Sequence, residues 1–165
     1  MTEKTQAASP EAVVQPKPPN LCFGCGKANA SGMQLDFTRD ETTKKVSGDF
    51  VLDARYQGAP GIAHGGIVAT VLDEALSKVS RFYGVSAVTA SLNVEYLKPV
   101  RIGQPIHVEA WLERSQGRQF YYVGEIRGAD GKVLARANGR FVAVDVQKLL
   151  RGGGFEPVNS KENGQ

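Results

Sequence analysis

The segment at residues 64–76, HGGIVATVLDEAL, constrains the fold more than any other part of the chain. Its apolar residues recur at spacings of three and four, which predicts a helix from about residue 66 to 83, ended by Gly84 in the left-handed conformation. At roughly 100° per residue, the apolar side chains cover about half of the helix circumference. An arc this wide must pack against other elements, so we expect the helix at the centre of the fold. The arc consists of Ile67, Val68, Val71, Leu72, Ala75, Leu76, Val79 and Phe82.

Two adjacent acidic residues, Asp73 and Glu74, fall on different faces of this predicted helix. Glu74 shares a face with Lys78 and Arg81 at spacings of four and three, which is typical of solvated ion pairs. Asp73 lies on a narrow strip of small residues, where another backbone or a thin ligand can approach closely and burial would change the carboxyl pKa. The pattern leaves open whether Asp73 is a functional carboxylate or hydrogen-bonds a neighbouring segment. The strip consists of Gly66, Ala69, Thr70, Ser77 and Ser80.

A glycine-rich loop, GAPGIAHGG, leads into the helix. Gly65 and Gly66 permit a tight turn that leaves first-turn N–H groups available to hold an anion or polarise a carbonyl, as in an oxyanion hole. The structural alternative is an ordinary loop entering a buried helix, with His64 a partly buried side chain. Asp73 lies about 10 Å along the axis from Gly66, too far to attack a carbonyl held at its own helix start. If both groups serve one reaction, two copies of the chain must meet.

The rest of the chain predicts strands. Residues 33–38 and 46–51 flank a charged turn before the helix. The antiparallel strands after the helix must curl around it to cover its wide apolar arc. Long edge strands would stay unpaired in a monomer, so side-by-side dimerisation is expected. The alternating segments after the helix are 91–97, 106–112, 120–126 and 133–141.

Length and composition favour a single domain. With 165 residues, 41% of them hydrophobic, the chain can bury a sizeable core. We expect the domain at 21–150 between flexible tails at 1–20 and 151–165, which are rich in proline or in glycine and asparagine. No apolar run could span a bilayer and no secretion signal is visible, so a cytoplasmic location is expected, without membrane association.

The charge pattern does not indicate nucleic-acid binding. The net charge is only +3 and the basic residues are scattered along the chain. Some cations on or beside strands could meet an anionic cofactor, although solvated strand faces explain most of them more simply. These residues are Lys98, Arg101, Arg136 and Arg140.

Cys22 and Cys25 form one CxxC pair within the sequence CFGCG. A structural zinc site needs four ligands, and no second CxxC or close histidine pair supplies the other two. A redox pair would follow a strand and open a helix, whereas here a proline-rich segment precedes and the turn-like KANASG follows. We interpret the segment as a tight turn and expect no metal and no cofactor.

These residues resemble the hotdog-fold acyl-CoA thioesterases, in the group that includes phenylacetate-pathway thioesterases and mammalian thioesterase superfamily members. The likeness runs from CFGCG to FVAVDV near Val146, and its most telling parts are YQGAPGIAHGGIVATVLDEAL and TASLNVEYLKPV. The resemblance implies an α+β hotdog fold, with a curled antiparallel sheet of about five or six strands around one long helix. It also implies hydrolysis of an acyl-CoA thioester at a site shared by two subunits of a homodimer, or of a homotetramer built as a dimer of dimers.

The resemblance also implies roles for individual residues. Asp73 resembles the catalytic carboxylate, acting as general base on water or as nucleophile on the thioester carbonyl. Gly65 resembles the backbone donor that polarises this carbonyl from the partner subunit, and His64 the residue that helps to position the thioester. Thr89 resembles the hydroxyl that orients the attacking group.

Two further residues are expected at the substrate. Gly66 belongs to the same helix start, and Gln57 lies beside Gly58, the position at which related thioesterases often carry Asn or Gln. The alternatives are a non-catalytic acyl-CoA-binding module and a hydratase or dehydratase acting on acyl thioesters. A pure binder does not require an acid at Asp73, and the spacing from HGG to Asp73 fits the hydrolases better.

Overall fold

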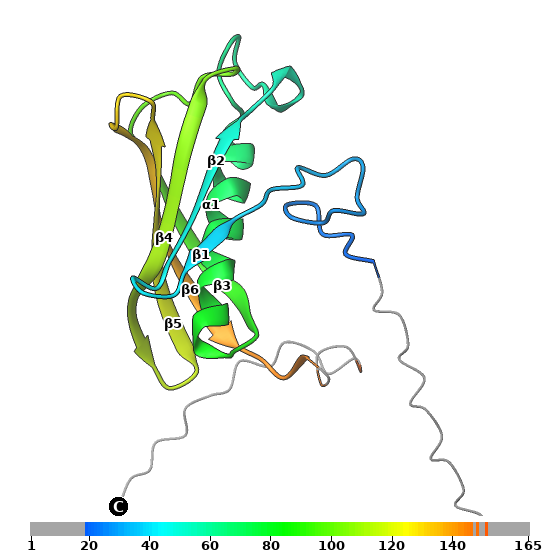
Figure 1. Cartoon of the computed structure of the whole chain (residues 1–165), viewed down its shortest axis with the longest axis vertical. Helices are drawn as coiled ribbons and strands as arrows, with labels where there is room; N and C mark the ends of the chain where they lie inside the picture. Colours follow the sequence, from blue (N-terminus) through cyan, green and yellow to red (C-terminus); the bar gives the residue numbers. More distant parts are fainter. Residues whose placement is uncertain (1–18, 147, 149–150, 152–165) are drawn as a thin grey trace, which may run out of the picture.

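The computed structural model describes residues 19–146, 148 and 151. Within them, six strands form one antiparallel sheet in the order β1-β2-β4-β5-β6-β3, and α1 lies along one face of this curled sheet (Figure 1). The prediction of two strands, one long helix and four further strands is confirmed. The elements are β1 (Thr38–Asp40), β2 (Lys45–Val51), η1 (Ala54–Tyr56), α1 (Gly65–Val79), η2 (Ser80–Tyr83), β3 (Ala87–Tyr96), β4 (Pro105–Gln116), β5 (Gln119–Gly128) and β6 (Val133–Ala143). The predicted tails lie mostly outside the described residues.

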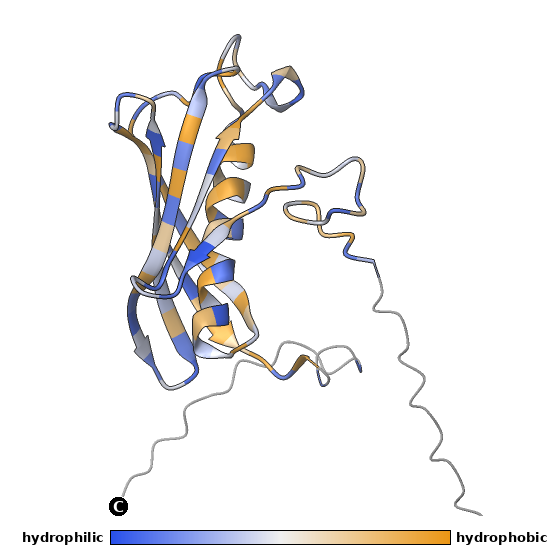
Figure 2. Cartoon of the chain, viewed as in Figure 1, coloured by the Kyte–Doolittle hydropathy of each residue, from blue (hydrophilic) through white to orange (hydrophobic). Residues whose placement is uncertain are grey.

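The core lies between α1 and the concave face of the sheet. Hydrophobic and polar residues alternate along β4 (Figure 2), because successive side chains of a strand point to opposite faces. The predicted apolar arc of the helix is buried, although Ile67 and Phe82 are only partly covered. The fully buried side chains from the helix and the strands include Val71, Leu72, Leu76, Val79, Val46, Val108, Ala110, Ile126, Ala135, Ala137 and Phe141.

Two strand glycines let α1 approach the sheet closely. A Cβ atom on Gly139 of β6 would lie 2.9 Å from the Leu76 side chain, and one on Gly124 of β5 would lie 3.1 Å from it. Such contacts are too short for a tightly packed interior, so larger residues would push the helix away. The depth of the helix in the curled sheet therefore depends on these two positions.

The end of the helix agrees with the prediction. After α1 the chain continues as the 3-10 helix η2 and ends at Gly84, which has φ 64°. This left-handed conformation costs glycine little because it has no Cβ atom.

The prediction of a strand at 33–38 was wrong, since β1 spans only Thr38–Asp40. The backbone N–H groups of Met33 and Leu35 donate to the carbonyls of Phe23 and Gly24, both at 2.8 Å. Gln34 between them has φ 51°, which a regular strand does not permit. These residues therefore pair with the CFGCG turn rather than with β2.

The prediction that Glu74 and Lys78 form a solvated ion pair was also wrong. Their charged groups are 2.9 Å apart, but the two side chains are only 13% and 16% exposed. The segment before β1 passes on the side of α1 away from the sheet (Figure 1), and Cys22 and Cys25 contact this pair. The predicted tight turn is confirmed, since the Gly26 N–H donates to the Cys22 carbonyl at 2.9 Å.

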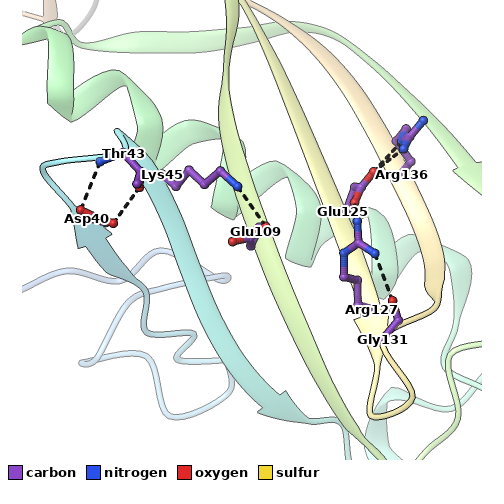
Figure 3. Close-up of polar contacts among 8 residues, drawn as sticks. All are labelled: Asp40, Thr43, Lys45, Glu109, Glu125, Arg127, Gly131 and Arg136. Carbon is purple, nitrogen blue, oxygen red and sulfur yellow. Dashed lines mark hydrogen bonds and ion pairs between the residues drawn. The ribbon is translucent and has the colours of Figure 1, made fainter.

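The convex face of the sheet carries a charged cluster. The alternation of hydrophobic and polar residues along the strands does not by itself predict this cluster. Glu125 of β5 is only 3% exposed and lies between Arg127 and Arg136, which both pair with its carboxylate (Figure 3). On the neighbouring strands, Lys45 pairs with Glu109 at 3.4 Å. Burying a carboxylate is costly unless it is paired, and the two guanidinium groups supply that pairing. Arg136 is therefore committed to Glu125 rather than positioned for an anionic cofactor.

Among the described residues, we find no helix with the length and apolar character needed to cross a bilayer.

Candidate active site

The loop before α1 is closed by its own hydrogen bonds. The Gln57 side-chain oxygen accepts from the Gly61 N–H at 2.8 Å, and the Gly58 N–H donates to the Ile62 carbonyl at 2.8 Å. A Cβ atom on Gly58 would lie 2.9 Å from the Cα atom of His64, so the loop packs directly on this residue. The Gln57 side chain thus closes the loop on Gly61.

His64 caps α1. Its Nδ1 atom accepts a hydrogen bond from the Gly66 N–H at 3.0 Å, and its backbone is extended at φ −62° and ψ 136°. This contact satisfies one of the four N–H groups that a helix start leaves without an intrahelical partner. Gly66 is therefore engaged by the cap in this structure. The Gly65 N–H donates no hydrogen bond within the described part of the chain, which makes it the more available of the two predicted donors.

Tyr96, at the end of β3, fixes the Gly65 peptide from the other side. Its hydroxyl donates to the Gly65 carbonyl at 2.9 Å, and its ring lies within 3.6 Å of where a Cβ atom on Gly65 would stand. Tyr96 is not among the site residues predicted from the sequence. Alternation along the strand places Tyr96 on the same face as core residues, but the side chain is 56% exposed. Its contact with Gly65 arises because the end of β3 lies beside the start of α1 in the folded chain.

Asp73 lies two turns further along α1 and is half-buried. The Thr89 hydroxyl of β3 donates to its Oδ1 atom at 2.7 Å. Burial raises the pKa of the Asp73 carboxyl above its ordinary value, the hydrogen bond from Thr89 lowers it in part, and the negative charge of Glu74 adds to the rise. A carboxylate with a raised pKa is a stronger base, and it accepts a proton more readily than an exposed one.

The neighbouring acid, Glu74, has the opposite electrostatic environment. Burial opposes its ionisation, but hydrogen bonds from Lys78, Cys25 and Cys22 outweigh burial and hold its pKa below the ordinary value. The predicted separation of the two acids onto different helix faces is thus confirmed, although Glu74 is covered by the CFGCG turn rather than by water.

The predicted site residues form two groups within one chain. His64, Gly65 and Gly66 stand at the start of α1, whereas Asp73 and Thr89 stand together about 12 Å along the helix axis, at 1.5 Å per residue for eight residues. One chain therefore does not bring these two groups together.

The four basic residues that the sequence offered for an anionic group lie in different environments in the structure. Lys98 and Arg101 are exposed, and the backbone of Arg101 forms an isolated β-bridge with Ile62 in the loop before α1. Arg136 pairs with Glu125, and Arg140 reaches the Gln119 side chain at 3.5 Å. Only Arg101 of these four is joined directly to the loop at the candidate site.

Comparison with known proteins decides the family. A family profile described as the thioesterase superfamily matches residues 60–135, the segment that carries His64, Gly65, Asp73, Thr89 and Tyr96. The chain belongs to the thioesterase superfamily. A crystal structure of another thioesterase superfamily protein is 32% identical, with a TM-score of 0.67, over 71% of this chain and 60% of that one. This likeness confirms the hotdog fold, with one helix against a curled antiparallel sheet.

Two further relatives extend the comparison. The acyl-coenzyme A thioesterase THEM4 of Mus musculus is 35% identical over 120 residues, which is 72% of this chain and 52% of that protein. A phenylacetic acid degradation-related protein of Ralstonia eutropha is 25% identical, with a TM-score of 0.62, over 72% of this chain and 90% of that one. This thioesterase superfamily chain spans about half the length of the mouse relative.

Proposed function

We propose that this chain hydrolyses acyl-CoA thioesters to a free acid and CoA, at sites shared between two copies of the chain. The observation that carries the proposal is the half-buried Asp73 carboxyl, held by Thr89 on a helix whose start offers the Gly65 N–H. The activity named for the THEM4 relative, an acyl-coenzyme A thioesterase, supports the choice of substrate class.

The chemistry requires two groups. Asp73 takes a proton from water as the water attacks the thioester carbonyl, and the Gly65 N–H of the other chain stabilises the negative charge that develops on the carbonyl oxygen. The intermediate then expels the CoA thiolate, which receives the proton from Asp73. General base catalysis contributes about 10²- to 10⁴-fold, and an oxyanion donor about 10²- to 10³-fold. In the alternative route, Asp73 attacks the carbonyl directly and displaces the CoA thiolate, and water then hydrolyses the resulting anhydride to the free acid and the Asp73 carboxylate.

The edge of the sheet supports assembly of two copies. β3 is ten residues long and pairs only with β6 in the order β1-β2-β4-β5-β6-β3, so its other edge has no strand partner in this sheet. Exposed strand edges favour pairing with another chain. Tyr96 and Leu97 at the end of this strand are 56% and 54% exposed, although both are large and apolar. A second copy placed along β3 would cover them and bring a second helix start toward Asp73.

The direct test compares purified wild type with the Asp73→Asn variant on short, long and aromatic acyl-CoAs, with release of free thiol as the measurement. We expect a fall in turnover of at least about 100-fold, the scale of losing a general base, with unchanged folding and oligomeric state. Turnover near that of the wild type in the variant would remove Asp73 from the mechanism. Wild-type protein that binds acyl-CoA but hydrolyses none of the panel would favour the non-catalytic binding module.

The shared site has its own test. Chains with Asp73→Asn and chains with Gly65→Pro, each inactive alone, are coexpressed so that mixed assemblies form. A mixed pair has one intact site, composed of Asp73 from one chain and the Gly65 N–H from the other, so activity should return. If mixing restores nothing while mixed pairs are present by mass, each site lies within one chain.

A further inference from the structure

The CFGCG turn is held rigidly against α1. The Cys22 N–H donates to the Asn20 side chain at 3.1 Å, and the Gly26 N–H closes the turn on the Cys22 carbonyl at 2.9 Å. The segment that follows anchors the turn again, because the Met33 N–H donates to the Phe23 carbonyl at 2.8 Å. These hydrogen bonds hold the two cysteines over the helix.

The turn brings both sulfur atoms to the carboxylate of Glu74. The Cys22 Sγ atom lies 3.1 Å from Glu74 Oε1, and one ligand atom from each of Cys22, Cys25 and Glu74 lies within 4.8 Å of the others. A Cβ atom on Gly24 would overlap the Glu74 side chain, so the glycine between the cysteines permits this close approach. The sequence offers only two ligands in one motif, and the fold adds a third from a distant helix.

We propose that Cys22, Cys25 and Glu74 bind a zinc ion. Two thiolates and one carboxylate oxygen are ligands that zinc accepts in tetrahedral sites, and thiolates select it over magnesium and calcium. The fourth position falls to water, which can reach the exposed Cys22. Zinc sites with three protein ligands keep a fourth position open to water, whereas closed sites have four protein ligands.

Lys78 completes the charge balance. Its ammonium group lies 2.9 Å from Glu74 Oε2 and 2.8 Å from Cys25 Sγ, so it leaves Oε1, the oxygen facing Cys22, as the metal ligand. Two thiolates and one carboxylate carry three negative charges, which one zinc ion and one lysine neutralise. A donor of this kind, hydrogen-bonded to the ligands themselves, orients them in known metal sites.

The test uses the full chain, reduced and stripped of metal with a chelator, and titrated with Co²⁺ as a spectroscopic probe for zinc. We expect one cobalt ion per chain, with thiolate-to-cobalt absorption in the near ultraviolet that Zn²⁺ abolishes by displacement. Cys22→Ser and Glu74→Gln should each weaken zinc binding by more than about 10-fold, the scale on which even outer contacts tune metal affinity. Asp49→Asn is the matched control, because its carboxylate contacts His107 elsewhere on the surface at 2.8 Å, and it should bind as the wild type does.

A second measurement needs no variant. Zinc should slow alkylation of both Cys22 and Cys25 in the wild type, read by mass spectrometry. The absence of thiolate-to-cobalt absorption, or alkylation at the same rate with and without zinc, would overturn the proposal. None of these readouts uses turnover, so the outcome does not depend on whether the chain is a thioesterase.

Discussion

Thr89 of β3 donates a hydrogen bond of 2.7 Å to the Oδ1 atom of Asp73 in α1. The contact joins an edge strand to the central helix at the carboxyl group that we propose as the catalytic base. It engages one carboxylate oxygen and leaves the second oxygen to accept from water. It also opposes the rise in the pKa of Asp73 that burial causes.

Removing the Thr89 hydroxyl should therefore change both the rate and its pH dependence. In Thr89→Ala, turnover should fall by about 10-fold, less than in Asp73→Asn, because the base remains while its orientation loosens. Loss of a hydrogen bond that lowers the pKa of Asp73 raises that pKa further, so the acid limb of the pH–rate profile should move to higher pH. Thr89→Ser keeps the hydroxyl and should leave the profile in place. A Thr89→Ala defect larger than that of Asp73→Asn would mean that the two roles are reversed.

Replacing Gly65 with proline should remove the oxyanion donor without disturbing the helix. Gly65 is the first residue of α1, where proline is well tolerated, and His64 already has the extended backbone that a residue before proline prefers. The Gly65→Pro variant loses the N–H at this position, so turnover should fall by about 10²- to 10³-fold. Circular dichroism and thermal unfolding should show a folded protein, as stable as the wild type or more so.

Gly65→Ala is the matched control for this prediction. It adds a Cβ atom at an ordinary contact distance of 3.6 Å from the Tyr96 ring and keeps the N–H. It should stay within a few-fold of wild-type turnover. If the alanine variant loses as much activity as the proline variant, the packing against Tyr96 matters and the N–H does not.

The periodic spacing of hydrophobic residues was enough to predict the regular elements of the fold. The helix, the four strands after it and the separation of Asp73 from Glu74 follow from spacings of 3.6 and 2 residues, because burial on one face forces those spacings. The strand order does not follow from them, since β3 pairs with β6 and not with β4, the next strand along the chain. The end at Gly84 was predictable because left-handed backbone strongly favours glycine.

The N-terminal turn and its neighbours could not be predicted in the same way. Burial of Glu74 depends on where the irregular segment around Cys22 docks, and no local pattern encodes that contact. The same segment takes the backbone partners of Met33 and Leu35, which shortened β1. Tyr96 was missed because its hydrogen bond to Gly65 joins two elements far apart in the sequence. These contacts are all tertiary, and they override local preference.

Asp73→Asn should raise the stability of the fold at neutral pH. Since burial raises the pKa of Asp73 in the folded state, the folded protein holds the proton more tightly than the unfolded chain, and the ionised carboxylate destabilises the fold above that raised pKa. Asparagine removes this charge. The variant should therefore melt at a higher temperature at pH 7, and the difference should shrink as the pH falls through the raised pKa of Asp73 toward the ordinary value for an aspartate. A variant that melts lower at pH 7 and equally low at acid pH would show that the carboxylate stabilises the fold.

The close approach of α1 to β6 should appear as energetic coupling between Leu76 and Gly139. Gly139→Ala places a methyl group 2.7 Å from the Phe141 ring and 2.9 Å from the Leu76 side chain and should destabilise the fold by about 1–3 kcal/mol through overpacking. Leu76→Ala leaves a cavity in the core and should cost about 2–5 kcal/mol. In the double variant the new methyl group occupies part of that cavity, so the loss in the free energy of unfolding should be smaller than the sum of the two single losses by at least about 0.5 kcal/mol.

Val46→Ala is the control for this coupling. Val46 is buried on β2, away from β6 in the sheet, so the effect of this variant should add to that of Gly139→Ala. Chemical denaturation of the wild type, the three single variants and both double variants measures each term, and simple additivity for Leu76 and Gly139 would contradict the packing described for the helix.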